Sequence, residues 1–94
     1  MKYVYILRSV RHPRQKYVGV TADLSQRLSY HNTGRCSHTS KFMPWEMIHT
    51  EPYENEADAF KRERQIKGWT SAKKDALILG DWKMLKELAQ RRVS

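Results

Sequence analysis

The chain has 94 residues, 39% of them apolar and 30% charged, which suits one folded globular domain and excludes a disordered chain. Its 18 lysines and arginines outnumber its 10 aspartates and glutamates, leaving a net charge of +8. Such an excess predicts a polyanionic partner, with nucleic acid ahead of an anionic membrane and plain solubility as the alternative.

Targeting signals and disulfides are not expected. No apolar run approaches the ~20 residues of a membrane span, and no long apolar region precedes a small-residue cleavage site. We therefore predict neither a membrane partner nor a signal peptide. Cys36 is the only cysteine, so the chain has no intramolecular disulfide, which favours a reducing cytoplasm.

The N-terminal residues predict an antiparallel hairpin. Residues 2–8 (KYVYILR) and 16–20 (KYVGV) are rich in the β-branched and aromatic side chains that favour strands. Residues 9–15 between them contain a proline and polar side chains, and are expected to turn the chain back. Gly19 is unusual in this setting, because glycine weakens a strand unless a backbone or ligand must approach closely.

A helix is predicted to follow the hairpin. Thr21 or Asp23 can cap its start, it runs to about Asn32, and a glycine two residues later stops it. Leu24 and Leu28 mark its inner side.

A basic loop and a third strand come next. Residues 34–44 (GRCSHTSKFMP) show no period and carry Arg35 and Lys41, so we interpret them as a loop. Residues 45–51 (WEMIHTE) alternate in polarity as a half-buried strand does, and Pro52 is expected to end it.

Three helices are predicted in the C-terminal half. Asn55 can cap the first, which runs to about Lys67; Thr70 or Ser71 opens the second, which ends near Gly80; and the third covers residues 81–90. The chain has no repeat, linker or low-complexity block. The elements therefore predict one α+β domain over residues 1–94, with its core over about 2–80.

The first of these helices carries a carboxylate on its apolar side. Ala59, Phe60 and Ile66 follow helical spacing, and Glu63 occupies the remaining position of the stripe. Burying a carboxylate is costly unless a cation or metal meets it. The alternative, favoured by periodicity alone, is a slightly rotated stripe in which Glu63 pairs with Lys67 four residues later.

A second polar cluster is predicted nearer the N-terminus. Arg27 and His31 are four residues apart and share one helix face, where they could clamp and protonate a phosphate. Tyr5 and Tyr17 lie on neighbouring predicted strands, close to such a site. Taken singly, a solvated helix face and two packed tyrosines explain these residues more simply.

Two other chemistries find little support. Cys36 and His38, with His31 or His12, match no zinc-ligand spacing. The four scattered glycines contain no phosphate-binding loop or dinucleotide fingerprint.

Taken in order, these residues resemble the GIY-YIG nuclease family, in particular its short, single-domain bacterial group. Tyr3-Val4-Tyr5 stands where the family has Gly-Ile-Tyr, and Tyr17-Val18-Gly19 stands where it has Tyr-Ile-Gly. Arg27, His31 and Glu63 follow in the family's order, and the resemblance covers nearly the whole chain.

The resemblance implies a small three-stranded antiparallel sheet flanked by helices, and a metal-dependent endonuclease that hydrolyses phosphodiester bonds in DNA rather than RNA, in repair or processing. It makes Glu63 the ligand of Mg²⁺ or Mn²⁺, and makes Arg27 the group that stabilises charge at phosphorus. Tyr17 or Tyr5 would help to activate water, while His31 would position it or take a proton. Contacts with the nucleic acid are expected from four cations: Lys16, Arg35, Lys41 and Lys67.

The chain also departs from the family pattern. Tyr3 replaces the first glycine of the name motif, and no asparagine follows Glu63, so that polar role is either absent or filled by another residue such as Lys67. No separate targeting module is apparent, so sequence selectivity is not expected from this chain alone: it would either cleave weakly and with little preference, or need a partner such as a protein scaffold. The competing hypothesis is a basic nucleic-acid-binding module with little or no catalysis, which would need the positive charge but not Glu63.

Overall fold

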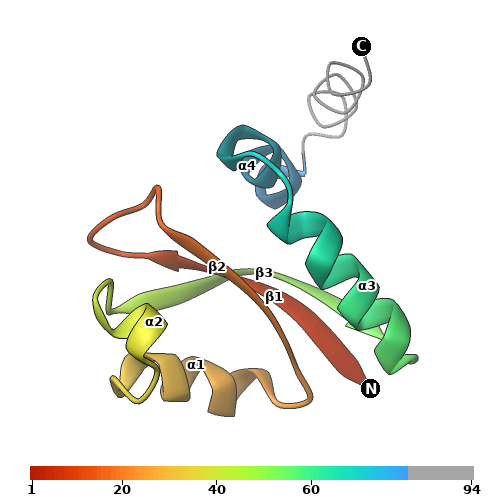
Figure 1. Cartoon of the computed structure of the whole chain (residues 1–94), viewed down its shortest axis with the longest axis horizontal. Coiled ribbons are helices and arrows are strands. Elements are labelled where there is room, and N and C mark those ends of the chain that lie inside the picture. Colours follow the sequence, from red (N-terminus) through yellow and green to blue (C-terminus); the bar gives the residue numbers. More distant parts are fainter. Residues whose placement is uncertain (81–94) are drawn as a thin grey trace.

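The three strands form one antiparallel sheet in the order β2-β1-β3. The computed structural model describes residues 1–80, and gives the strands as β1 (Lys2–Ser9), β2 (Lys16–Thr21) and β3 (Trp45–Tyr53) (Figure 1). The predicted hairpin pairs Tyr5 with Gly19 at its centre. The α+β class predicted from the sequence is thereby confirmed, whereas the helix predicted over residues 81–90 lies outside the described residues.

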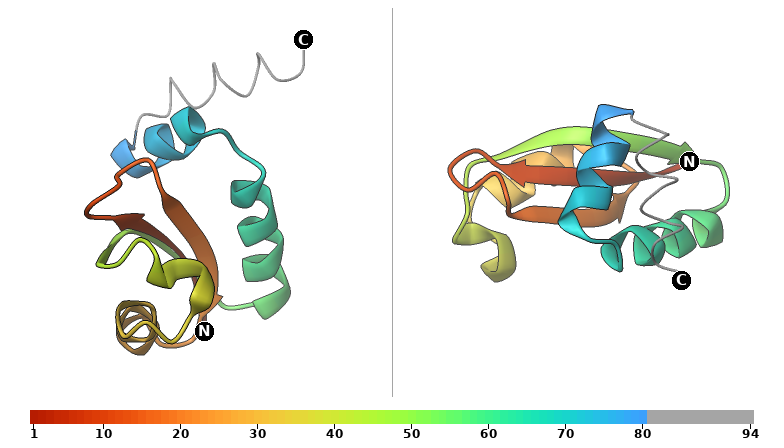
Figure 2. Two further views of the ribbon diagram at one scale, coloured as in Figure 1. Left: turned by 60° about the vertical axis from the view of Figure 1, so that its left-hand side comes forward. Right: turned by 90° about the horizontal axis from the view of Figure 1, so that it is seen from above.

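Helices cover both faces of this sheet. On one face lie α1 (Leu24–Asn32) and the short α2 (Ser37–Ser40), and on the other α3 (Glu56–Lys67) and α4 (Ser71–Leu79) (Figure 2). The longer helices begin where capping residues were predicted, because each cap side chain accepts a hydrogen bond from a backbone amide of the first turn. The three caps are Asp23, Asn55 and Thr70. None of the helices within residues 1–80 is long and apolar enough to cross a lipid bilayer.

The period of two along the strands divides the core between the two faces. Val4 and Ile6 of β1 point toward α3 and α4, where they pack with Ala59 and Ile66. Tyr5 and the other alternate residues of β1 and β2 point toward α1, in a second cluster that includes Leu7, Tyr17, Trp45, Leu24 and Leu28. The tyrosines of the predicted site therefore share a face with the helix that carries Arg27 and His31.

An ion-pair network fixes α3 against β3. Both carboxylate oxygens of Glu51 accept from the Arg62 guanidinium, at 2.8 and 3.2 Å, and they also accept from Tyr53 and pair with His49. Burial raises the pKa of Glu51, but these hydrogen bonds outweigh it and lower the pKa to about 2. The network orients α3 so that its opposite flank faces β2.

Three sequence predictions need correction. The third strand does not end at Pro52, which pairs with Tyr3 and is tolerated because β3 is an edge strand. The segment predicted as a loop over residues 34–44 contains α2, one turn of helix. Phe60, placed on the inner stripe of α3 by its spacing, is 43% exposed, because the buried stripe centres on Ala59 and Ile66.

Candidate active site

Tyr5 and His31 form the buried half of the candidate site. Tyr5 is 2% exposed at the centre of β1, and its hydroxyl lies 3.0 Å from Nε2 of His31, which is 1% exposed in the last turn of α1. On the other side of the imidazole, Nδ1 lies 3.0 Å from the hydroxyl of Thr39 in α2. Both ring nitrogens therefore have oxygen partners, which fixes the orientation of the imidazole.

Gly19 makes room for Tyr5. The two residues are cross-strand partners, and a Cβ built on Gly19 would lie 2.5 Å from the tyrosine hydroxyl oxygen and 2.6 Å from Cζ. No side chain fits there unless the ring moves. Gly19 in a strand predicted that another group approaches the backbone closely, and that group is the phenol ring of Tyr5. The ring crosses over Gly19 of β2, and its hydroxyl contacts His31 on α1.

Burial keeps this pair uncharged. It raises the pKa of Tyr5 well above its usual range, and the neighbouring Tyr17 adds to the effect while Arg27 opposes it. Burial also lowers the pKa of His31, and the positive charge of Arg27 lowers it further. At neutral pH Tyr5 keeps its proton and His31 is a neutral imidazole.

Tyr17 and Arg27 form a more exposed half of the site. The Tyr17 ring is half-buried on β2, with its centroid 4.8 Å from that of His31 and 6.3 Å from that of Tyr5. Among the described residues its hydroxyl has no hydrogen-bond partner. Arg27 lies one turn before His31 on α1, and its guanidinium is 5.3 Å from the ring centroid of Tyr30.

Glu63 reaches the site from α3, on the far face of the sheet. It lies between the buried Ala59 and Ile66 on the inward side of the helix, and its side chain is only 14% exposed. Lys67 Nζ is 2.7 Å from its carboxylate and 6.0 Å from the centroid of the Tyr17 ring. The lysine therefore links α3 to the phenol on β2, and both sequence interpretations of Glu63 were correct in part: the stripe is inward, and the i,i+4 pair forms.

The donor set fits a hard divalent cation held largely by non-protein ligands. Within residues 1–80, no three histidine, cysteine or acidic side chains converge on one point where a metal could bind. A zinc site would need such a cluster, whereas Mg²⁺ keeps most of its waters and takes further oxygens from a phosphate. A single carboxylate such as Glu63 is compatible with binding of that kind, and its role as the metal ligand stays a prediction.

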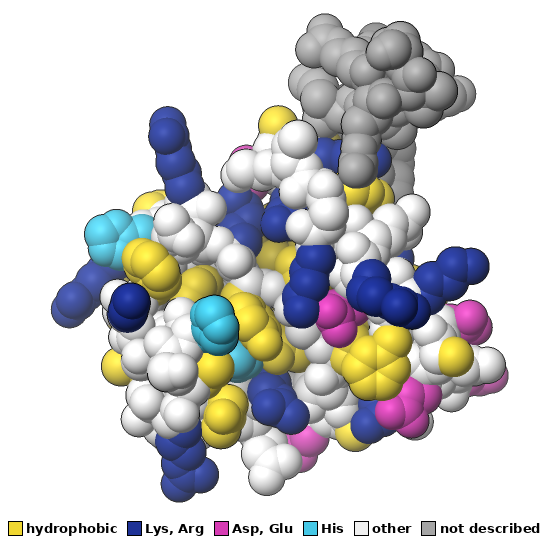
Figure 3. All heavy atoms as spheres, in the orientation of Figure 1, with side chains coloured by type: hydrophobic (Ala, Val, Ile, Leu, Met, Phe, Trp, Pro, Cys, Tyr) yellow, Lys and Arg dark blue, Asp and Glu magenta, His cyan; other side chains and the backbone are white. Residues whose placement is uncertain are grey.

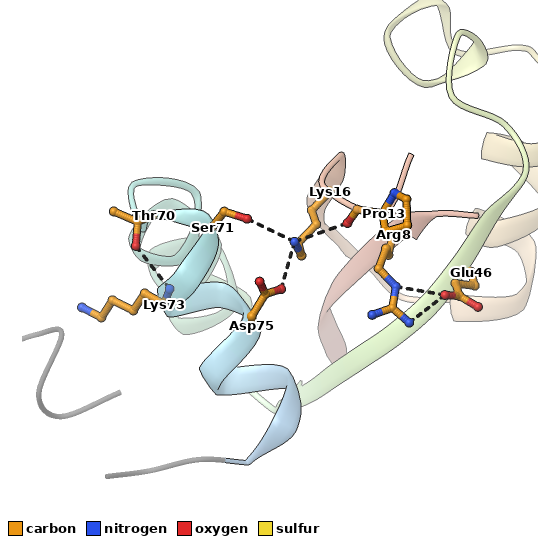
Figure 4. Close-up of polar contacts among 8 residues, drawn as sticks. All are labelled: Arg8, Pro13, Lys16, Glu46, Thr70, Ser71, Lys73 and Asp75. Carbon is orange, nitrogen blue, oxygen red and sulfur yellow. Dashed lines mark hydrogen bonds and ion pairs between the residues drawn. The ribbon is translucent and has the colours of Figure 1, made fainter. Parts of the chain in front are cut away.

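Lys16, predicted to contact nucleic acid, has a structural role (Figure 4). Its ammonium pairs with Asp75 of α4 at 2.9 Å and donates to Ser71 and to the Pro13 carbonyl, and its side chain is 5% exposed. It lies on the face of β2 away from Tyr17, because its position alternates with that of the tyrosine. This lysine ties the hairpin to α4, and its predicted contact with nucleic acid would require it to leave these partners.

The other three predicted cations, Arg35, Lys41 and Lys67, are exposed. In Figure 3 lysine and arginine side chains are spread over the whole face shown, several of them beside α3, where most of the acidic side chains of this face also lie. The contacts of these three cations with nucleic acid stay a prediction.

Two supporting residues could not be found from the sequence. Thr39, which holds the His31 ring, lies in a segment without a period, where nothing marks a threonine as a buried partner. Asn32 exchanges two hydrogen bonds with the backbone of Trp45, and the Trp45 indole donates to the Thr39 carbonyl. These contacts join α1, α2 and β3 around the imidazole, and only tertiary structure brings them together.

The chain resembles known proteins over most of its length. The family model described as the GIY-YIG catalytic domain matches residues 1–75. A UPF0213 protein of Natronomonas pharaonis is 32% identical over 77 residues, which cover 81% of this chain and 88% of that protein. A UPF0213 protein of Bacillus pumilus is 34% identical over 77 residues, covering 81% and 76% respectively. The solution NMR structure of a UPF0213 protein from Bacillus halodurans matches the fold with a TM-score of 0.53 and 28% identity, over 83% of each chain.

Proposed function

Because the chain belongs to the GIY-YIG catalytic domain family, we propose that it is a metal-dependent endonuclease that hydrolyses phosphodiester bonds in DNA. One observation carries the proposal most strongly. A half-buried phenol lies against a fixed neutral imidazole, and Arg27 lies one turn before that imidazole on the same helix. An inward carboxylate pairs with Lys67, whose ammonium is 6.0 Å from the centroid of the phenol ring. A module that only binds nucleic acid would need the cations and would gain nothing from this carboxylate.

The geometry divides the work between the two tyrosines. Tyr5 is buried, and its hydroxyl is hydrogen-bonded to His31. Because burial raises the pKa of Tyr5, the phenol keeps its own proton and cannot accept one from the attacking water. In the proposed mechanism it is a positioning residue that holds His31, and His31 in turn supports the Tyr17 ring. Tyr17 is the phenol that meets the attacking water.

The chemical step needs positive charge around Tyr17. The Lys67 ammonium, 6.0 Å from the ring centroid, supplies that charge. The Tyr17 hydroxyl accepts a hydrogen bond from the attacking water and orients it, and as the water oxygen bonds to phosphorus its proton passes to solvent. The bond from phosphorus to the leaving sugar oxygen breaks in the same step, and that oxygen is protonated from solvent. Arg27 stabilises the charge on the non-bridging oxygens.

Glu63 would hold the divalent cation, with the remaining positions filled by water and substrate phosphate. When bound, the cation stabilises the leaving oxygen and lowers the pKa of its waters. The Lys67 ammonium must leave the Glu63 carboxylate for this to happen. Because that lysine is half exposed, its ammonium can move into water when the cation takes its place beside the carboxylate.

A matched pair of isosteric substitutions, each of which removes one carboxylate charge, tests the proposal. Glu63→Gln should abolish cleavage of labelled duplex, flap or branched DNA in Mg²⁺ or Mn²⁺, while binding persists or tightens because a negative charge is lost. Glu56→Gln, on the exposed first turn of the same helix, should cleave like the wild type. Cleavage by Glu63→Gln at the wild-type rate contradicts the proposed metal ligand. Tight binding by the wild type without cutting of any substrate, including single-stranded RNA, would favour the binding module.

A further inference from the structure

A polar hollow of about 430 Å³ opens beside α1. Its volume lies within the range of ~300–1,000 Å³ that small-molecule sites occupy, and suits one nucleotide. Its walls come from α1 and from the segment that leads to α2, and they are Gln26, Arg27, Ser29, Tyr30, Thr33 and Arg35. No acidic side chain is among these wall residues, so the hollow favours an anion.

The hollow combines the two groups that recognise a nucleotide without regard to its sequence. Arg27 and Arg35 offer guanidinium forks that suit phosphate oxygens. Tyr30 offers an aromatic ring outside both core clusters, with the Arg27 guanidinium 5.3 Å from its centroid. An aromatic ring beside an arginine is a surface on which a nucleobase stacks.

The hollow also adjoins the candidate active site, with which it shares Arg27. Arg27 lines it, and the charge of the same residue acts on both Tyr5 and His31. The edge of Tyr30 meets the His31 ring, with the two centroids 5.5 Å apart. A phosphate on Arg27 would therefore have the catalytic groups on one side and the hollow on the other.

We propose that this hollow binds an unpaired nucleotide of the DNA strand, next to the phosphodiester that is cut. Its base stacks on Tyr30, and Arg35 binds its phosphate. The proposal rests on the proposed function, since it takes that strand as the substrate. A base inside a duplex must leave its stack to enter such a hollow, whereas an unpaired base enters without that cost. The site therefore favours single strands, flaps and branch points over continuous duplex.

Binding without cleavage tests the proposal on the full chain. Fluorescence anisotropy in EDTA compares a labelled single-stranded oligonucleotide with a duplex of the same sequence. Tyr30→Ala should weaken single-strand binding by about 5- to 100-fold, the range found when a stacking aromatic is removed, and should change duplex binding by less than about 3-fold. Tyr30→Phe keeps the stacking face and should bind like the wild type.

The cation and the volume of the hollow are tested separately. Arg35→Ala should weaken single-strand binding more than Lys61→Ala, which removes an exposed cation from a different hollow, beside Tyr53 and Arg62. Ser29→Trp fills the hollow from an exposed position and leaves Tyr30 in place, so it should reproduce the Tyr30→Ala defect. This variant decides the question if Tyr30→Ala does not fold.

A base analogue gives a direct signal. The emission of 2-aminopurine in the oligonucleotide should be quenched on the wild type, as stacking requires, and should stay unquenched on Tyr30→Ala. Equal losses on single strands and duplex, or no loss with folded Tyr30→Ala and Ser29→Trp, overturn the inference even if the protein cleaves DNA. Tyr30-dependent single-strand binding by a protein that cuts nothing would sustain the inference and refute the proposed nuclease.

Discussion

Replacing Gly19 by alanine should displace Tyr5 and weaken the whole buried half of the site. The new Cβ would lie 2.5, 2.6 and 2.9 Å from Oη, Cζ and Cε1 of Tyr5, where ordinary contacts begin near 3.4 Å, so the ring must move by several tenths of an ångström or more. The ring is 2% exposed and has no free volume to enter. Overpacking of this kind costs about 1–3 kcal/mol, and the strained hydrogen bond to His31 adds about 0.5–1.5 kcal/mol. Alanine regains about 0.5–1 kcal/mol in a strand, which leaves a net loss of about 2 kcal/mol.

Urea unfolding of four proteins isolates the cause: wild type, Gly19→Ala, Tyr5→Leu and the double variant. Leucine removes the atoms that the new Cβ would meet, so Gly19→Ala should stabilise the Tyr5→Leu background by about 0.5–1 kcal/mol. The coupling between the two sites should then be about 2–3 kcal/mol. Cleavage should fall in Gly19→Ala together with stability, because His31 loses its fixed partner.

Gly68 supplies the matched control. It ends α3 at φ −79°, and a Cβ there would lie 3.6 Å from the nearest carbonyl oxygen, an ordinary contact. Gly68→Ala should therefore be neutral or stabilising by up to about 1 kcal/mol. The reasoning fails if Gly19→Ala is no more costly than Gly68→Ala, or if its cost is the same with leucine at position 5.

Further predictions concern charge and the division of labour between the tyrosines. Because the pKa of Glu51 falls from 4.5 to about 2 on folding, its carboxylate contributes about 3 kcal/mol above pH 4.5, which is lost as the pH falls toward 2. In urea unfolding at a series of acidic pH values, the free energy of unfolding should therefore fall less steeply with decreasing pH for Glu51→Gln than for the wild type. The variant should also be less stable at pH 7. Lys16→Met should lower stability by about 1 kcal/mol or less, because its partner carboxylate is half exposed, and should leave DNA affinity within about 2-fold in an anisotropy titration. In single-turnover cleavage, Tyr17→Phe should remove activity, whereas Tyr5→Phe should retain part of it and lose thermal stability; the opposite ranking would reverse their proposed roles.

The sequence predicted those parts of the molecule that local rules determine. The hairpin follows from β-branched and aromatic residues on either side of a polar turn, and α1 begins at Asp23 because an aspartate there can cap it. The close approach at Gly19 was visible as a glycine out of place in a strand, although not what approaches it. The family resemblance then grouped Tyr5, Tyr17, Arg27, His31 and Glu63, which no local pattern could have joined.

Tertiary context determined what the sequence could not. Pro52 ends a strand by local rules, yet β3 continues through it because its free edge needs no donor there. Lys16 had the charge expected of a phosphate contact, but alternation along β2 turns it to the opposite face, where Asp75 binds it. Thr39 became a partner of His31 only because one turn of helix formed in a segment without periodicity.

Catalysis and stability share the same strands in this small chain. Successive side chains of β1 and β2 point to opposite faces of the sheet: one face packs against α3, and the other carries Tyr5 and Tyr17. A displacement of either strand therefore disturbs the packing on both faces. Glu63 lies on the opposite side of the sheet, on α3. Lys67 connects it to Tyr17, because the lysine ammonium pairs with the Glu63 carboxylate and lies 6.0 Å from the centroid of the Tyr17 ring. The place of Glu63 thus depends on how Ile66 seats α3 against the sheet. A cavity made there, as by Ile66→Ala, should cost about 2–5 kcal/mol and also move the carboxylate, so it should lower cleavage at temperatures where the protein is still folded. The exposed Leu79, on α4, lies outside this packing, and its replacement by alanine should do neither.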